Sequence, residues 1–127
     1  MKNVILVGLG GALGAISRYG VGCFFRAYVE HPFPYATLVV NVSGCLAIGV
    51  LYTAIRAHFP PPFLSLLVII GIGFLGAYTT FSTYGFETIE LMRNAKMSLA
   101  LINIALNNIL CLAAVVCGVF LGGLIKL

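Results

Sequence analysis

Charged residues are scarce in this 127-residue chain: they make up 8% of it, against about 25% in a typical soluble domain. Hydrophobic residues account for 61%, and the mean hydropathy is +1.13. This small amount of polar surface cannot cover a globule in water. A soluble domain is therefore excluded, and lipid is expected to surround most of the exterior. A helix needs roughly 20 residues to cross about 30 Å of hydrocarbon. We therefore expect residues 1–127 to form a single all-α transmembrane domain of four helices.

Three other chemical signatures are missing. The seven Lys and Arg residues are scattered singly, which suits helix-end anchors and argues against nucleic-acid binding. The four cysteines lie in apolar runs without CxxC or His-paired spacing, so neither a metal cluster nor a disulfide framework is predicted. No nucleophile stands beside a base, so no enzyme is predicted.

A glycine-rich stretch at residues 4–14, VILVGLGGALG, imitates a dinucleotide-binding turn. Its third glycine is misplaced for G-x-G-x-x-G, and no βαβ pattern surrounds it. Nucleotide binding is therefore not expected from this segment.

Apolar runs separated by helix breakers predict where the four helices lie. The breakers are the linker at residues 30–34, the prolines at 60–62 and a polar turn at 93–96. The expected helices span about residues 3–25, 35–57, 63–92 and 98–126.

Fifteen glycines are many for a helical chain, because an interior glycine weakens a helix in water. In membranes, small residues instead let helix backbones approach closely. Gly10-x-x-x-Gly14 and Gly118-x-x-x-Gly122 have the spacing of such contacts, so tight helix packing is predicted at both places.

Basic residues flank the expected spans evenly. With four spans, the termini and the middle loop share one side, and the two remaining loops share the other. The first side carries Lys2, Arg56 and Lys126, and the second carries Arg26, Arg93 and Lys96. This balance gives the positive-inside rule no preference, so the chain can insert in both orientations. Because four thin helices also enclose little volume, an antiparallel, dual-topology homodimer is predicted.

The third expected helix has an unusual centre. Residues 71–87 carry four glycines and four Ser or Thr hydroxyls, which make a poor continuous helix. A broken helix would present free carbonyl and amide groups at mid-membrane, where they can hold ions. The alternative is a continuous glycine-rich helix that serves packing alone.

Two sets of side chains are candidates for a polar path. Phe81 and Tyr84 are three residues apart and share a helix face, where their electropositive ring edges can face an anion; aromatic packing is the alternative. Asn41, in the second helix, and Asn103 and Asn107, one turn apart in the fourth, can line a path or simply join helices.

Arg18 lies about 22 Å along the first helix at 1.5 Å per residue. A cation within a span is a functional candidate, here one that draws anions into a vestibule. Snorkelling to the interface, or pairing with Glu87 or Glu90, is the alternative.

Three sequence blocks together resemble the CrcB-type (Fluc) fluoride channels. They are residues 10–19 (GGALGAISRY), 37–44 (TLVVNVSG) and 76–84 (GAYTTFSTY). Their order and spacing fit that family over essentially the whole chain, and the last block is the most specific.

The resemblance implies a function. It implies a fluoride-specific channel of the bacterial inner membrane that passively exports fluoride from the cytoplasm. It further implies an antiparallel homodimer with two pores, and a structural Na⁺ at the dimer centre held by the backbone carbonyls of Gly76 and Thr79. Arg18 matches the vestibule arginine.

The resemblance also implies which side chains line the fluoride pore. They are Asn41, Phe81, Ser82, Thr83, Tyr84, Asn103 and Asn107. The chain departs from the family at Tyr84, where phenylalanine is commoner, and at Ala77, where glycine is often found.

The alternative function is a small four-helix, proton-coupled multidrug transporter. Such a transporter needs an ionisable carboxylate deep in a helix. The acidic residues of the third segment, Glu87 and Glu90, fall late in it, which favours the channel.

Overall fold

The computed structural model describes residues 1–58, 65 and 67–125, and its regular elements are all helical. They are α1 (Lys2–Tyr28), α2 (Tyr35–His58), η2 (Leu67–Leu75), α4 (Gly76–Tyr78), α5 (Phe81–Arg93) and α6 (Met97–Leu124). η2, α4 and α5 follow one another as a single span, so the structure holds four apolar helical spans long enough to cross a membrane. The expectation of four transmembrane helices is confirmed. The expected break at 60–62, the start at 63 and Lys126 lie outside the described residues.

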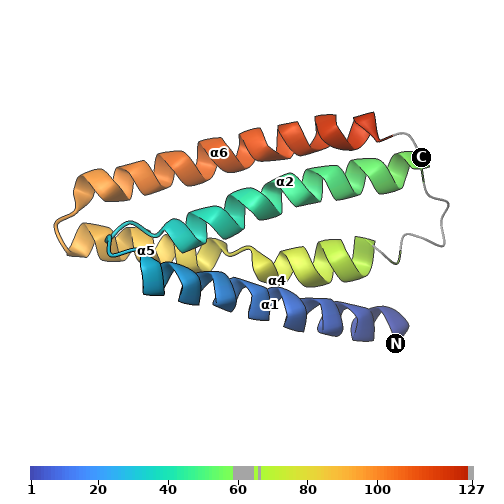
Figure 1. Cartoon of the computed structure of the whole chain (residues 1–127), viewed down its shortest axis with the longest axis horizontal. Coiled ribbons are helices and arrows are strands. Elements are labelled where there is room, and N and C mark those ends of the chain that lie inside the picture. The colour runs from blue at the N-terminus through green and yellow to red at the C-terminus, as the bar shows by residue number, and fades with distance from the viewer. Residues whose placement is uncertain (59–64, 66, 126–127) are drawn as a thin grey trace.

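The spans run alternately up and down along one long axis (Figure 1). The start of α1 and η2 and the ends of α2 and α6 lie at one end of the bundle, and the 29–34 and 94–96 connections lie at the other. α2 packs along α6, and α1 packs along η2 and α4. The two pairs place the centre of the third span beside both α1 and α2.

Glycines bring the helices of each pair into close contact. A Cβ added to Gly73 in η2 would lie 3.1 Å from the Cα of Gly10 in α1. One added to Gly49 in α2 would lie 3.0 Å from the Cα of Gly118 in α6. Because no side chain larger than hydrogen fits at these crossings, the packing predicted for both GxxxG motifs is confirmed.

The third span is interrupted near its centre. α4 ends at Tyr78, Thr79 and Thr80 are extended (φ −79°, ψ 158° and φ −153°, ψ 114°), and α5 starts at Phe81. Among the described residues, the third span thus consists of helical parts separated at Thr79 and Thr80. Before these two residues, η2 is π-helical over nine residues, which the sequence pattern did not predict.

The outer surface of the bundle is mostly apolar. Large hydrophobic side chains of α1 and α6, such as Leu9, Leu13, Leu112 and Phe120, are more than half exposed. In a membrane these side chains face lipid or another protein, since both are apolar environments. Buried positions include two polar ones in α6, Asn103 and Asn107.

Candidate functional site

The side chain of Asn41 in α2 binds the backbone at the break. Its Oδ1 accepts a hydrogen bond from the Thr80 N–H at 2.8 Å, and its Nδ2 donates to the Thr80 carbonyl at 3.2 Å. In a continuous α-helix the Thr80 N–H would donate to the carbonyl of Gly76, four residues back. Asn41 therefore withdraws the N–H that would otherwise satisfy the Gly76 carbonyl.

Thr80 caps α5 and has the same effect on a carbonyl three residues further on. Its Oγ1 accepts a hydrogen bond from the Thr83 N–H at 3.2 Å, as an N-cap side chain does. That N–H would donate to the Thr79 carbonyl in a continuous helix. The family resemblance assigns the Gly76 and Thr79 carbonyls to Na⁺, and both have helical N–H donors that bind elsewhere. Neutral carbonyl oxygens freed in this way are suitable ligands for a hard cation.

A chain of hydrogen bonds continues from Asn41 into α6 and back to α5. Asn41 Nδ2 donates to Asn107 Oδ1 at 3.0 Å, and Asn107 Nδ2 donates to Asn103 Oδ1 at 2.9 Å. Asn103 Nδ2 donates to Thr88 Oγ1 at 2.9 Å, and the Thr88 hydroxyl donates to the Tyr84 carbonyl at 2.7 Å. The amides of α2 and α6 therefore form one connected network with the third span.

A cavity of about 370 Å³ adjoins the break on the α6 side. It is lined by residues of α2, the third span and α6, among them Asn41, Gly76, Thr79, Phe81, Tyr84, Asn107 and Asn108. The cavity therefore unites both predicted cation ligands with four of the predicted pore residues. Asn103 is 0% exposed and supports this cavity from behind through Asn107.

The two aromatic rings of the predicted pore meet at the edge of this cavity. Their centroids are 5.3 Å apart with the planes tilted by 55°. Tyr84 is 8% exposed, whereas Phe81 is 81% exposed. The Phe81 ring therefore contacts Tyr84 on one side and otherwise projects from the surface of the bundle.

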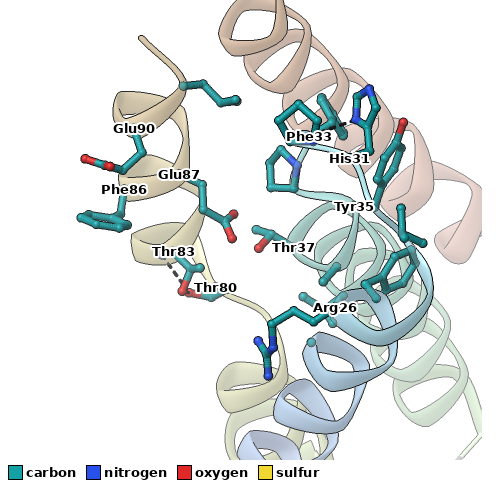
Figure 2. A pocket seen from close by; sticks show the side chains of 18 of the residues that line it. Arg26, His31, Phe33, Tyr35, Thr37, Thr80, Thr83, Phe86, Glu87 and Glu90 are labelled. Carbon is teal, nitrogen blue, oxygen red and sulfur yellow. Dashed lines mark hydrogen bonds between the residues drawn. The ribbon is translucent and has the colours of Figure 1, made fainter. Parts of the chain in front are cut away.

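A second cavity, of about 640 Å³, opens on the other side of the break, toward the 29–34 connection. Thr80 lines both cavities, and Arg18, Thr37, Thr83 and Glu87 line this one. Figure 2 shows the Glu87 carboxylate pointing toward Thr37 from across the cavity. Glu87 Oε2 is buried, with no hydrogen-bond partner among the described residues. The larger cavity is thus lined by basic, acidic and hydroxyl side chains that belong to the helical spans.

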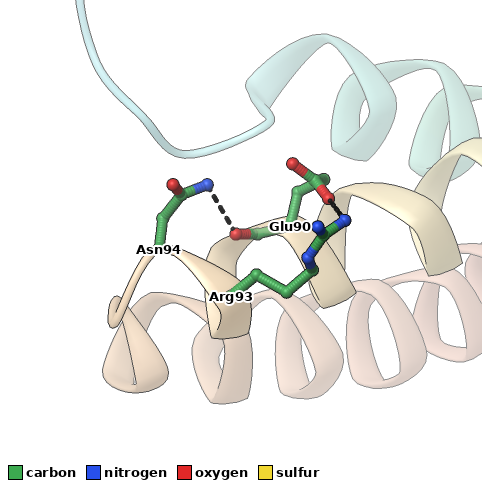
Figure 3. Close-up of polar contacts among 3 residues, drawn as sticks. All are labelled: Glu90, Arg93 and Asn94. Atoms are coloured by element: carbon green, nitrogen blue, oxygen red, sulfur yellow. Dashed lines mark hydrogen bonds and ion pairs between the residues drawn. The ribbon is translucent and has the colours of Figure 1, made fainter.

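Arg18 reaches the break from α1. Its Nη1 donates to the Thr79 carbonyl at 3.5 Å, a long bond. Glu90 instead forms its ion pair with Arg93, one turn away, at 2.8 Å (Figure 3). Asn94 Nδ2 donates to the Glu90 carbonyl at the end of α5. Arg18 therefore lies beside the break, in the larger cavity, and is not paired with Glu90.

The serine and threonine that follow the break have different positions. Thr83 lines the larger cavity, and its Oγ1 accepts a hydrogen bond from Thr80 Oγ1 at 3.0 Å. Ser82 is exposed and lies 3.3 Å, oxygen to oxygen, from Thr80 Oγ1, and neither cavity includes it. Of the predicted pore residues, Ser82 and Asn103 thus lie outside both cavities.

The sequence interpretation missed three polar residues of the site. Thr37 faces Glu87 across the larger cavity, Thr88 joins Asn103 to α5, and Asn108 donates to the Tyr84 hydroxyl. Each is a polar side chain within an apolar run, which was the available signal. Thr37 and Thr88 are 4% and 5% exposed, as expected for polar groups that face a bundle interior.

Fold and site together define a four-span membrane protein with a broken span that gathers polar groups, a construction used by channels and transporters. The family model for "CrcB-like protein, Camphor Resistance (CrcB)" matches residues 5–119. The chain belongs to the CrcB family.

Curated relatives agree with this family. A protein of Shewanella oneidensis named "Fluoride-specific ion channel FluC" is 43% identical over 119 residues, 93% of this chain and 94% of that protein. A protein of the same name from Shewanella loihica is 44% identical over 118 residues, again 93% and 94% of the two chains. The similarity therefore covers nearly the whole length of both proteins.

Proposed function

We propose that this protein is a fluoride-specific channel that lets fluoride leave the cytoplasm passively. Membership of the CrcB family and the names of its relatives support this proposal. The structural observation that carries it is the cavity at the break, where Asn41, Phe81, Tyr84 and Asn107 meet. These side chains come from three helices and join amide, hydroxyl and aromatic groups within a membrane-spanning bundle.

The chemistry of these groups suits a small, strongly hydrated anion. A narrow path has to replace the water around fluoride with other hydrogen-bond donors. Hydroxyl groups supply them, and the edges of aromatic rings are electropositive without a full charge that would trap the ion. Chloride is larger and accepts hydrogen bonds less strongly, so the same path favours fluoride.

The functional unit in this proposal is an antiparallel homodimer. Phe81 is 81% exposed, and Gly76 and Asn108 are also exposed on the single chain. Polar groups facing hydrocarbon are costly, so polar side chains in spans normally face protein or a water-filled cavity. A second copy covering this face would close the pore around Phe81 and bring two broken helices together. The even flanking charge of the sequence, three basic residues on each side of the expected spans, supports insertion in both orientations.

A structural Na⁺ at the dimer centre belongs to the same proposal. The Gly76 and Thr79 carbonyls would hold it, because their helical N–H donors bind Asn41 and Thr80 instead. The ion would supply positive charge to these two carbonyl oxygens, of which that of Thr79 also accepts a long hydrogen bond from Arg18.

The channel acts in the bacterial inner membrane. The test of its function is fluoride efflux from proteoliposomes that contain the purified protein, with chloride as the control ion. The rival transporter would use Glu87, a carboxylate within a span, as its proton site. Such a transporter exchanges protons for a cationic drug and carries no fluoride, so fluoride efflux in the absence of drug separates the two.

A further inference from the structure

The amides that line the smaller cavity have already used their N–H groups. An asparagine amide has two N–H donors. Asn41 Nδ2 donates to the Thr80 carbonyl and to Asn107 Oδ1. Asn107 Nδ2 donates to the Asn103 carbonyl at 3.2 Å and to Asn103 Oδ1 at 2.9 Å. An ion in the cavity can therefore take a hydrogen bond from either amide only by breaking one of these bonds.

The Tyr84 hydroxyl, in contrast, has not used its proton in a hydrogen bond. Asn108 Nδ2 lies 3.2 Å from the Tyr84 hydroxyl oxygen and 2.8 Å from the Ile104 carbonyl oxygen. A carbonyl only accepts hydrogen bonds, so the Ile104 contact requires the amide nitrogen, not the amide oxygen, to lie on this side. The same nitrogen then donates to Tyr84. The Tyr84 oxygen is an acceptor in this contact, and its own proton stays available.

The position of this hydroxyl makes its free proton useful. Tyr84 and Asn108 both line the cavity, and the Tyr84 ring lies beside that of Phe81. The ring is 8% exposed and so is fixed by packing. A phenol is a strong donor, and hydrogen bonds to an anion are roughly twice as strong as those between neutral groups. Among halides, fluoride is the best hydrogen-bond acceptor.

We propose that the Tyr84 hydroxyl donates a hydrogen bond to fluoride in the cavity, and that Asn108 is a positioning residue that keeps the Tyr84 proton free for this bond. The inference rests on the proposed fluoride pathway and adds two elements to it. One is a donor that phenylalanine cannot supply at this position. The other is a residue on α6 that acts through Tyr84.

A double-mutant cycle tests this assignment. The four proteins are the wild type, Tyr84→Phe, Asn108→Leu and the double variant, each reconstituted in proteoliposomes. The initial rate of efflux is measured over a series of fluoride concentrations, and size-exclusion chromatography checks that each variant is intact. Tyr84→Phe keeps the ring, so it is expected to conduct fluoride. Its half-saturating fluoride concentration is expected to be roughly tenfold higher, because one hydrogen bond to a charged group is lost. Asn108→Leu is expected to raise the half-saturating fluoride concentration by less than Tyr84→Phe does. The double variant is expected to have the same half-saturating concentration as Tyr84→Phe.

Tyr78→Phe is the matched control. Ser43 donates to the Val39 carbonyl at 2.6 Å, so in the 3.1 Å contact between the two hydroxyls the Tyr78 proton binds Ser43. Removing this hydroxyl is expected to leave the half-saturating fluoride concentration unchanged.

The outcomes separate the inference from the function on which it rests. A wild-type protein that does not conduct fluoride overturns the proposed function. A conducting wild type with an unchanged half-saturating concentration in Tyr84→Phe overturns the inference alone. Additive effects of Tyr84→Phe and Asn108→Leu mean that Asn108 does not act through Tyr84, and they overturn its positioning role.

Discussion

Polar side chains around the break bind one another before they bind any ion. Asn41 is the clearest case, since it holds both the N–H and the carbonyl of Thr80 and also donates to Asn107. Such a fully bonded network fixes the positions of its members and makes each substitution felt by its neighbours. Phe81, in contrast, is 81% exposed, and its ring contacts that of Tyr84. Substitutions at these two positions therefore test different things.

Phe81→Ile tests the aromatic edge by itself. Isoleucine keeps the residue apolar and nearly as large, so packing should change by about 1 kcal/mol or less. The electropositive ring edge is lost, and fluoride efflux is expected to fall by orders of magnitude. Efflux is compared with the size-exclusion profile of the same preparation. Wild-type efflux in this variant would mean that Phe81 is a packing residue of the dimer and that the ion passes elsewhere.

Asn41→Asp is expected to abolish fluoride efflux. The carboxylate would place oxygen where Nδ2 now donates to the Thr80 carbonyl and Asn107. It would also put a negative charge beside the fluoride path, where a low dielectric strengthens repulsion. Asn3→Asp makes the same change in the first turn of α1, where an acidic residue is favoured, and should conduct normally. Normal conduction by Asn41→Asp would remove Asn41 from the path.

The sequence and its family resemblance named these residues as pore candidates but did not name their hydrogen-bond partners. Asn41, Phe81, Tyr84 and Asn107 were all predicted for the pore, and the structure brings them to one cavity. The bonds between Asn41 and Thr80 join positions 39 residues apart, which no local spacing reveals. For the same reason Asn108 was missed, because its role depends on a ring in another helix.

At the scale of elements, hydrogen bonds from side chains stabilise the break in the third span. Glycines weaken the helix on its N-terminal side, but the two displaced N–H groups are held by Asn41 and by the Thr80 cap. Apolar run length and breakers predicted the four spans well, because a helix that crosses a bilayer has to be long and apolar. The π-helical geometry of η2 was not predicted, since an unbroken apolar run has no periodicity that separates one helix type from another.

Thr80→Val tests the cap and the sodium proposal together. Valine has no oxygen to accept from the Thr83 N–H, and losing such a cap typically costs about 1 kcal/mol. The freed N–H can return to the Thr79 carbonyl, which removes a proposed Na⁺ ligand. Thermal unfolding in detergent is measured in sodium and in N-methylglucamine. Wild type and Thr80→Ser should lose stability without sodium, and Thr80→Val should lose less. An equal Tm in both salts for the wild type would count against the ion.

At the scale of the molecule, one chain leaves the proposed pathway open on one side. The exposed Phe81, Gly76 and Asn108 form part of a face that needs a partner if it lies within the bilayer. The chain's balanced flanking charge allows that partner to be an inverted second copy.

Reporter fusions test this orientation. A C-terminal reporter that is active only in the cytoplasm and one that is active only outside it should both give signal. Adding two lysines to the 94–96 connection should then shift the population toward one orientation. A single orientation in the unmodified chain would contradict the antiparallel dimer while leaving the family assignment intact.

Fluoride efflux from proteoliposomes tests the central claim most directly. Vesicles loaded with fluoride or with chloride, at equal pH inside and out, are given a permeable counter-ion, and the released anion is followed with an ion-selective electrode. The account predicts rapid fluoride release, no chloride release above protein-free vesicles, and no need for a pH gradient. Equal release of both anions, or fluoride release only when a pH gradient is imposed, would contradict a fluoride-specific channel.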